Sequence, residues 1–178
     1  MLIEALNFLS ARCEGKFKRF GYLHEAIAID ARFRRCKSAW KSHLENTKSE
    51  ILSAIDKTSK HAKVVVLGAG AGYDIPLDEL ERQFDRVVLV DVVFLRYIRK
   101  KAEKSSKITL VEADLTGLVD SLEYLGADFD VKEIQSKPPV DLLGGADLVI
   151  SCNILSQLPI SIQNWLIKSG VDEDDGNL

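Results

Sequence analysis

Long apolar runs are missing from this chain of 178 residues. The longest runs, such as Val64–Leu67 and Val87–Val90, have the length of strands, far below the roughly 20 residues that a membrane-spanning helix needs. The chain also lacks an N-terminal basic stretch followed by an apolar one, so we expect no signal peptide. These absences predict a cytoplasmic protein that does not contact a membrane.

Paired cysteines and histidine motifs are missing as well. Cys13, Cys36 and Cys152 are odd in number and widely spaced, with no CxxC pair. We expect reduced thiols packed as small apolar groups, and Cys152 is interpreted as packed rather than nucleophilic because no histidine lies near it in the sequence. The three histidines show neither HxxxH nor HExxH spacing, so no metal site is predicted.

Charge is divided unevenly along the chain. Residues 1–63 contain 13 Lys and Arg and 7 Asp and Glu (+6), whereas residues 64–178 contain 11 and 20 (−9), giving the net charge of −3. A basic run with two phenylalanines, over residues 12–20, leaves contact with nucleic acid or another anion open. A solvated surface is the simpler interpretation of this run.

The first third of the chain is predicted to be helical. Apolar residues recur at helical spacing from Tyr22 to Leu44 and include Phe33 and Trp40. We expect this stripe to pack on the following domain and the arginines beside it to face solvent. The capping-box sequence Thr47-Lys48-Ser49-Glu50 predicts that a helix restarts near Thr47. Residues 1–62 are therefore interpreted as an N-terminal helical cap.

From Lys63 onward, strands and helices alternate, which is typical of a parallel α/β sheet. Valine-rich and other apolar runs predict strands at residues 63–67, 86–90, 108–112 and 147–150. Helices are expected at residues 76–84, 95–104 and 118–125 and around 162–167, with a loop at 126–145. The predicted fold class is α/β: a Rossmann-like parallel sheet of about four strands flanked by helices, over residues 63–170. An acidic tail at 171–178 is expected to be disordered.

The turn after the first predicted strand carries three alternating glycines, Gly68, Gly70 and Gly72. Glycine permits the positive φ angles of such a turn and lets a ligand approach the backbone without a Cβ atom in the way. A following helix directs unsatisfied N–H groups and a partial positive charge to the same place. This order of strand, glycine turn and helix predicts a loop that binds a nucleotide cofactor.

Polar residues follow the other predicted strands. Asp91 ends the second strand, where its carboxylate can accept hydrogen bonds from both hydroxyls of a ribose. Asp114 follows the third strand and either accepts from an adenine amine or shapes and caps a turn. Asn153 follows the fourth strand and either faces the reactive group of the cofactor or only forms a turn. The carboxyl ends of parallel strands meet at one edge of a sheet, so these residues are expected to lie together.

At these residues the chain resembles the class I S-adenosylmethionine-dependent methyltransferases. Leu67–Gly72 is similar to their first motif, and Leu89–Asp91 to the acidic position after the second strand. Glu112–Leu115 is similar to the turn that contacts adenine, and Asp147–Asn153 to the fourth strand and its loop.

The resemblance implies that S-adenosylmethionine is the cofactor and that its methyl group passes, by direct in-line displacement, to an acceptor that the sequence does not identify. It implies that the N–H groups of the glycine turn hold the methionine carboxylate, that Asp91 holds the ribose, and that Asp114 and Leu115 hold the adenine. The complete predicted cofactor site consists of Gly68, Ala69, Gly70, Gly72, Asp91, Val92, Asp114, Leu115 and Asn153.

Three features differ from the usual pattern of this family. Val66 occupies the position, two residues before the first glycine, where the family usually has an acid. The sequence at 151–155 lacks the Asn/Asp-Pro-Pro-Tyr/Phe signature of enzymes that methylate amines in nucleic acids or in glutamine. Four strands are predicted rather than seven, so the fourth strand should form a sheet edge that a second copy of the chain or another partner could cover.

Two other functions remain open from the sequence. A non-catalytic or truncated module could bind S-adenosylmethionine without turnover, and Val66 and the small number of strands favour it. An NAD-dependent oxidoreductase could use Asp91 for its own ribose in the same way. Against the oxidoreductase, Tyr73 stands where the GxGxxG pattern of NAD loops has its third glycine.

Overall fold

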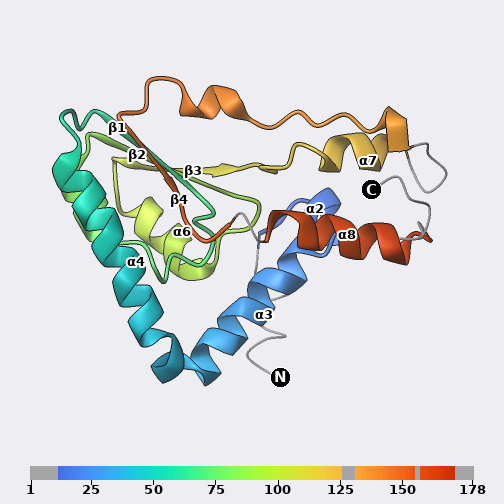
Figure 1. Cartoon of the computed structure of the whole chain (residues 1–178), viewed down its shortest axis with the longest axis horizontal. Coiled ribbons are helices and arrows are strands. Elements are labelled where there is room, and N and C mark those ends of the chain that lie inside the picture. Colours follow the sequence, from blue (N-terminus) through green and yellow to red (C-terminus); the bar gives the residue numbers. More distant parts are fainter. Residues whose placement is uncertain (1–11, 126–130, 155–156, 171–178) are drawn as a thin grey trace.

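The computed structural model of the chain describes residues 12–125, 131–154 and 157–170 (Figure 1). Within them, one sheet has four parallel strands in the order β3-β2-β1-β4: β1 (Lys63–Leu67), β2 (Arg86–Asp91), β3 (Ile108–Glu112) and β4 (Leu148–Ser151). The predicted α/β class with a Rossmann-like parallel sheet is therefore confirmed. β1 and β3 have the predicted bounds, β2 is one residue longer at its end, and β4 begins and ends one residue later than predicted.

Helices surround the sheet. Their bounds are α2 (Gly15–Arg19), α3 (Tyr22–Arg35), α4 (Lys37–Lys57), α5 (Leu77–Gln83), α6 (Arg96–Glu103), α7 (Val119–Leu125) and α8 (Leu158–Lys168), with short 3-10 turns at Val131–Glu133 and Val140–Leu143. None of the described helices is long and apolar enough to cross a membrane. The predicted tail at 171–178 lies outside the described residues, and the division of the chain at residue 62 stays a prediction.

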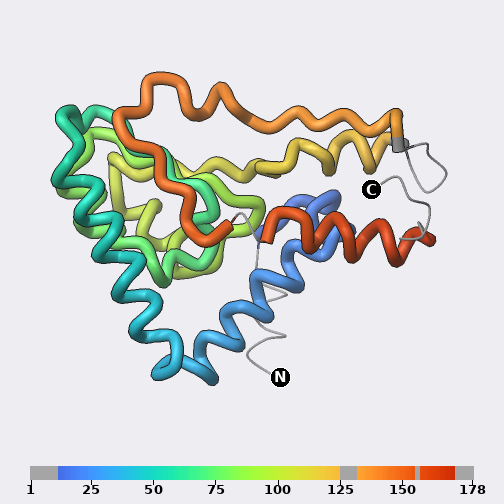
Figure 2. The backbone as a smooth tube through the Cα atoms, viewed as in Figure 1, coloured from blue at the N-terminus to red at the C-terminus, as the bar shows by residue number. Residues whose placement is uncertain are grey.

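The two faces of the sheet have different cover. On one face, side chains such as Val64 and Leu89 pack against α4, α5 and α6. On the other face, Val65 and Val88 belong to a cluster with the 3-10 turn at Val140–Leu143. Figure 2 shows the chain returning from α7 past β3 to this turn and then to β4. Because both faces of β1 and β2 are covered, these strands have unbroken apolar sequences rather than alternating ones.

β4 forms an edge of the described sheet, as predicted. It pairs with β1, where Val149 lies opposite Val65, and no other described strand pairs with it. The Val149 side chain is 44% exposed. This edge is the part of the sheet where a further strand or a partner can add.

The N-terminal helices are divided differently from the prediction. α3 ends at Arg35 and α4 begins at Lys37, so the break lies at Cys36 and the predicted restart near Thr47 is wrong. The Thr47 hydroxyl donates to the carbonyl of His43, one turn earlier in the same helix (3.1 Å). The capping-box residues are thereby accommodated inside a continuing helix. α3 and α4 form a V whose tip points away from the sheet (Figure 1).

A different face of α3 packs on the protein from the one that the sequence suggests. Leu23, Ile27, Asp30 and Ala31 are the buried residues of this helix. The apolar stripe predicted from Tyr22 onward lies on the neighbouring face and packs only in part. Tyr22 and Ala26 are partly buried against a hydrophobic core and Phe33 stacks on Tyr73, as predicted, but much of the stripe also lines a cavity.

A second hydrophobic core joins the N-terminal helices to the C-terminal ones. Leu23 of α3 lies in it together with Leu122 of α7 and Leu166 of α8. Phe20, which follows α2, stacks on Trp165 of α8 with 4.6 Å between ring centroids. This core holds α2 and α3 beside the loop that follows β2.

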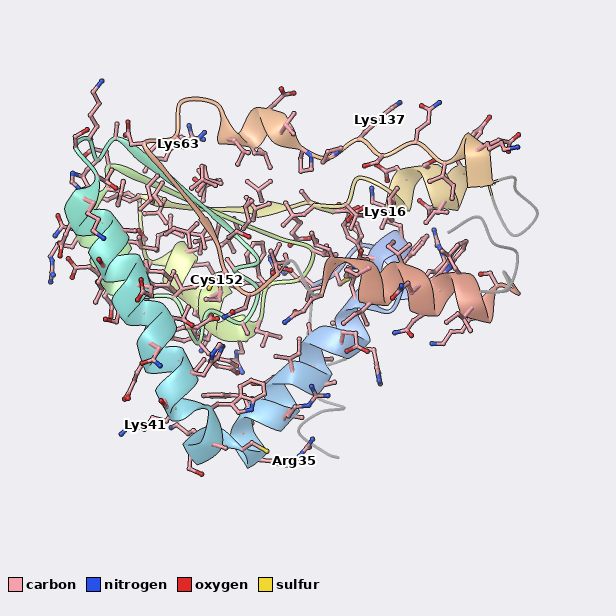
Figure 3. The ribbon with its side chains drawn as sticks, in the orientation of Figure 1. Lys16, Arg35, Lys41, Lys63, Lys137 and Cys152 are labelled. Atoms are coloured by element: carbon pink, nitrogen blue, oxygen red, sulfur yellow. The ribbon has the colours of Figure 1, made fainter. Side chains whose placement is uncertain are left out.

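Ion pairs occupy much of the basic run at residues 12–20. Lys16 Nζ lies 2.6 Å from Asp120 Oδ1, and Arg19 pairs with Glu123, so both basic side chains contact α7. Figure 3 shows Lys16 at this junction. The charges of this run therefore hold α2 against α7.

Candidate functional site

A cavity of about 550 Å³ opens at the carboxyl edge of the sheet. The loops that follow β1, β2, β3 and β4 form its floor, and α3, α4 and the start of α8 form its walls. All predicted site residues except one line this cavity: Gly68, Gly70, Gly72, Asp91, Val92, Asp114, Leu115 and Asn153. The exception is Ala69, whose side chain is fully buried in the core.

The glycine loop, residues 68–72, depends on glycine in two ways. Gly68 and Gly72 have φ angles of 80° and 65°, in the left-handed region that favours glycine. Gly70 has no positive φ, but a Cβ atom there would lie 2.6 Å from the Val93 carbonyl oxygen and 2.8 Å from Asp91 Oδ2. The loop is thus shaped to bring backbone close to the floor of the cavity.

The loop uses only part of its N–H groups for its own structure. The first three donate to the Val90 carbonyl or to the Asp91 carboxylate, at 2.7 to 3.2 Å. The N–H groups of Ala71 and Gly72 donate to no described residue, and both residues line the cavity. Two adjacent N–H groups are therefore available to the anionic end of a ligand. Ala71 lies within the turn whose N–H groups the resemblance assigned to the carboxylate, although it was not among the named site residues.

Asp91 lies at the tip of β2, as predicted. Its Oδ2 accepts a hydrogen bond from the Gly70 N–H (2.7 Å) and its Oδ1 from the Val93 N–H (3.3 Å). Burial raises the pKa of this carboxyl group, and the backbone N–H groups oppose that shift. Each carboxylate oxygen can accept one more hydrogen bond, so Asp91 keeps the capacity to hold two hydroxyl groups.

Asp114 shapes the turn between β3 and α7. Its carboxylate accepts hydrogen bonds from the N–H and hydroxyl of Thr116 (2.9 and 2.7 Å) and from the N–H groups of Leu118 (2.9 Å) and Val119 (3.0 Å). This geometry matches the capping interpretation of Asp114, and the adenine contact stays a prediction. The turn places Leu115 in the lining of the cavity.

Asn153 joins the loop after β4 to the glycine loop. Its φ of 50° is that of a turn residue, and its Nδ2 donates to Asp74 Oδ2 (2.7 Å). The neighbouring Cys152 is buried, and burial together with the charge of Asp74 raises the pKa of its thiol to about 12. The thiol is therefore neutral at neutral pH, in line with the expectation of a packed cysteine.

Tyr73, the residue that interrupts the GxGxxG pattern, connects the glycine loop to α3. Its ring stacks on Phe33 with 3.8 Å between centroids and 19° between planes. Its hydroxyl donates to Asp30, which is 4% exposed and also pairs with Arg34 (2.8 Å). Burial, and then the hydrogen bond to Asp30, raise the pKa of Tyr73, so the phenol stays protonated. We call these contacts the Tyr73 latch.

The sequence reasoning missed the walls of the cavity. They include Tyr22, Ile29 and Arg32 of α3 and Trp40, His43 and Leu44 of α4. The apolar stripe at helical spacing was the available signal, but periodicity does not distinguish a face that packs from a face that lines a cavity. The hydroxyl of Tyr22 is buried and has no hydrogen-bond partner within the part of the chain that the structure describes.

The cavity has more acidic than basic groups. Four carboxylates line it, those of Glu25, Asp74, Asp91 and Asp114. The basic groups in the lining are those of Arg32 and His43, both on the wall. Among the described residues no group of three or more histidine, cysteine, aspartate or glutamate side chains could hold a metal ion.

Comparison with known proteins adds no family to this description. No protein-family model, no curated protein and no solved structure matches the chain. The interpretation of the site therefore depends on its own geometry.

Proposed function

We propose that this chain binds S-adenosylmethionine in the cavity and is a methyltransferase. The observation that carries the proposal is the combination of a glycine loop having two free N–H groups with a cavity floor lined by carboxylates. S-adenosylmethionine has one carboxylate, one ammonium and one sulfonium group, so it needs both kinds of partner.

The glycine loop supports the proposal at the methionine end. The N–H groups of Ala71 and Gly72 can hold the carboxylate, because no described residue takes them. Asp74, directly after the loop and fixed by Asn153, supplies a negative charge to the positively charged groups. Asp74 also compensates for Val66, which stands where an acid is usual.

Asp91 and the turn after β3 support the proposal at the adenosine end. Asp91 keeps a free acceptor site on each oxygen for the two ribose hydroxyls. A larger residue at position 70 would push into Asp91 and the Val93 carbonyl, so glycine leaves this approach open. Asp114 shapes the turn that places Leu115 in the cavity, where an apolar side chain can contact a base.

The same lining argues against NAD. The pyrophosphate of NAD carries two negative charges and normally lies at the N-terminus of a helix directly after the glycine loop. Here Tyr73–Pro76 separates the loop from α5, which has only seven residues and begins at Leu77 with Asp78 and Glu79 in its first turn. Asp74 adds a negative charge to the cavity lining close to the glycine loop, which disfavours a doubly charged pyrophosphate there.

In this proposal the chain positions the cofactor and the acceptor and does not supply a strong base. When bound, S-adenosylmethionine would supply a methyl group on a positively charged sulfur for transfer to the acceptor. The N–H groups of Ala71 and Gly72 and the carboxylates of Asp74 and Asp91 would hold it in place. Cys152 is a neutral thiol at neutral pH and is no candidate nucleophile. α3 and α4 supply the walls beside the floor that would hold the cofactor.

Calorimetric titration of the wild-type chain tests the proposal. S-adenosylhomocysteine should bind and NAD should not. Binding of NAD without S-adenosylhomocysteine would refute the proposal in favour of the oxidoreductase. A labelled-methyl assay on cell extract then separates the two remaining functions, since cofactor binding without transfer would identify a non-catalytic module.

A further inference from the structure

A basic surface surrounds the junction of α3 and α4, and we call it the basic elbow. Residues 31–44 contain no Asp or Glu, and their basic residues are Arg32, Arg34, Arg35, Lys37 and Lys41. Figure 3 shows Arg35 and Lys41 at the tip of the V that the two helices form, well away from Lys16. The elbow is therefore separate from the basic run on α2.

Acidic groups neutralise only part of the elbow. The buried Asp30 pairs with Arg34, and the exposed Glu45 lies 3.7 Å from Lys41, one helical turn earlier. An exposed ion pair at that distance is weak, so it leaves Lys41 available to an anionic ligand. Arg32 and Lys37 form no ion pair with any residue that the structure describes. The basic run on α2, in contrast, is matched by acids of α7.

The elbow continues into the cavity. Arg32 lines the wall, and Trp40 lines it from the opposite helix with its side chain half-buried. The Trp40 ring contacts the Phe33 ring, with 6.1 Å between ring centroids and 52° between planes, and this contact helps to fix the position of Trp40. Basic side chains beside a supported aromatic ring are the features with which proteins bind single-stranded nucleic acids.

The charge of the cavity changes from floor to mouth. Three of the four carboxylates, those of Asp74, Asp91 and Asp114, lie on the loops of the floor. The fourth, Glu25, lies near the start of α3, whereas Arg32 and His43 lie on the walls toward the elbow. A cationic ligand is favoured at the floor and an anionic one at the mouth.

We propose that the basic elbow binds the phosphate groups of a nucleotide, free or within a single strand, and that Trp40 stacks on its base. The binding itself stands on the elbow alone. That the nucleotide is the methyl acceptor rests on the proposed function, because it places the base at the mouth of the cavity that holds the cofactor.

Fluorescence anisotropy with a labelled ten-nucleotide single strand tests the phosphate contacts. The double variant Arg32→Gln/Lys37→Gln should weaken binding by up to roughly 50-fold at 50 mM salt and flatten the salt dependence by about 1.4 in slope, as the loss of two phosphate contacts requires. Lys57→Gln/Lys60→Gln removes the same charge at the other end of α4, about 30 Å away at 1.5 Å per residue. This control should bind like the wild type.

Tryptophan fluorescence tests the base contact. The chain has two tryptophans, Trp40 and Trp165, so the variant Trp165→Phe leaves Trp40 as the single reporter and keeps an aromatic ring against Phe20. Addition of the strand should quench Trp40. Trp40→Leu should weaken binding by roughly 5- to 100-fold, the effect of one stacked base.

The outcomes separate this inference from the proposed function. Binding of uridine or adenosine monophosphate as well as the strand supports a free nucleotide as the source, and binding of the strand alone supports nucleic acid. If neither binds, or if both double variants weaken binding equally, the inference is overturned while the titration with S-adenosylhomocysteine still stands. If the strand binds and quenches Trp40 but S-adenosylhomocysteine does not bind, the elbow is supported and the proposed function fails.

Discussion

Replacing Asp91 by Asn tests the centre of the proposed cofactor site. The side-chain oxygen of Asn can still accept from the Gly70 N–H, which lies 2.7 Å from Asp91 Oδ2, so the glycine loop keeps its internal hydrogen bond. The change removes the negative charge and one of the two acceptor oxygens. One ribose hydroxyl then loses its partner.

The expected loss follows from the value of one hydrogen bond to a charged group. Such a bond contributes about 1.5–3 kcal/mol, so Asp91→Asn should weaken the binding of S-adenosylhomocysteine roughly 10- to 100-fold. The fold should be retained. Burial raises the pKa of Asp91 in the folded state above its value in the unfolded chain. The folded protein therefore loses stability as the pH rises above the unfolded-state pKa, because the carboxyl group ionises more readily in the unfolded chain. Asn cannot ionise and removes this loss.

Isothermal titration calorimetry on the wild type and Asp91→Asn measures the change, with the midpoint of thermal unfolding at pH 7 as the check on folding. Asp78→Asn is the matched control, because its carboxylate is 90% exposed, pairs with Lys101 and lies outside the cavity. The control should bind like the wild type. A folded Asp91→Asn that binds S-adenosylhomocysteine as tightly as the wild type would refute the assignment of the ribose to Asp91.

Three further predictions concern the loop, its latch and the thiols. Gly70→Ala should cost about 1–3 kcal/mol of stability through overpacking and abolish cofactor binding, because its Cβ would lie 2.6 Å from a carbonyl oxygen. Urea unfolding measures the first effect and calorimetry the second. The control Gly15→Ala, whose Cβ would lie 3.9 Å from its nearest atom, should show neither effect. Tyr73→Phe keeps the ring stack but removes the hydroxyl that donates to the buried Asp30, so urea unfolding should show a loss of about 1–3 kcal/mol in stability. An unchanged unfolding midpoint would show that this hydroxyl contributes nothing to the latch. In the native protein at pH 8, iodoacetamide should label the exposed Cys36 and leave Cys152, whose pKa is raised to about 12, unlabelled; equal labelling by mass spectrometry contradicts this.

The sheet and the loops at its carboxyl edge were predictable because their signals are local. Valine-rich runs bounded by turn residues mark β1 and β2, and the alternating glycines mark the loop that joins β1 to the next helix. Asp91 and Asp114 follow from the rule that parallel strands end at one edge. These inferences need only neighbours in the sequence.

Contacts between distant residues were not predictable in the same way. The bond between Asn153 and Asp74 spans 79 residues, and that between Tyr73 and Asp30 spans 43. Periodicity gives the faces of α3 but not what each face meets. The helix uses the face of Leu23 and Ile27 for packing and the neighbouring one for the cavity. The capping box at Thr47 failed for a related reason, because a local cap pattern does not end a helix whose backbone bonds continue.

The residues that line the cavity come from two hydrophobic cores, since Cys152 belongs to one and Val92 to the other. The sheet with α4, α5 and α6 forms one core, and α2, α3, α7 and α8 surround the other. A ligand that touches both can bind only when both are folded and docked, so its binding free energy is added to their joint stability. We therefore expect a ligand bound in the cavity to make the unfolding of the two cores more cooperative. A ligand bound in the cavity would thus couple the unfolding of the two cores.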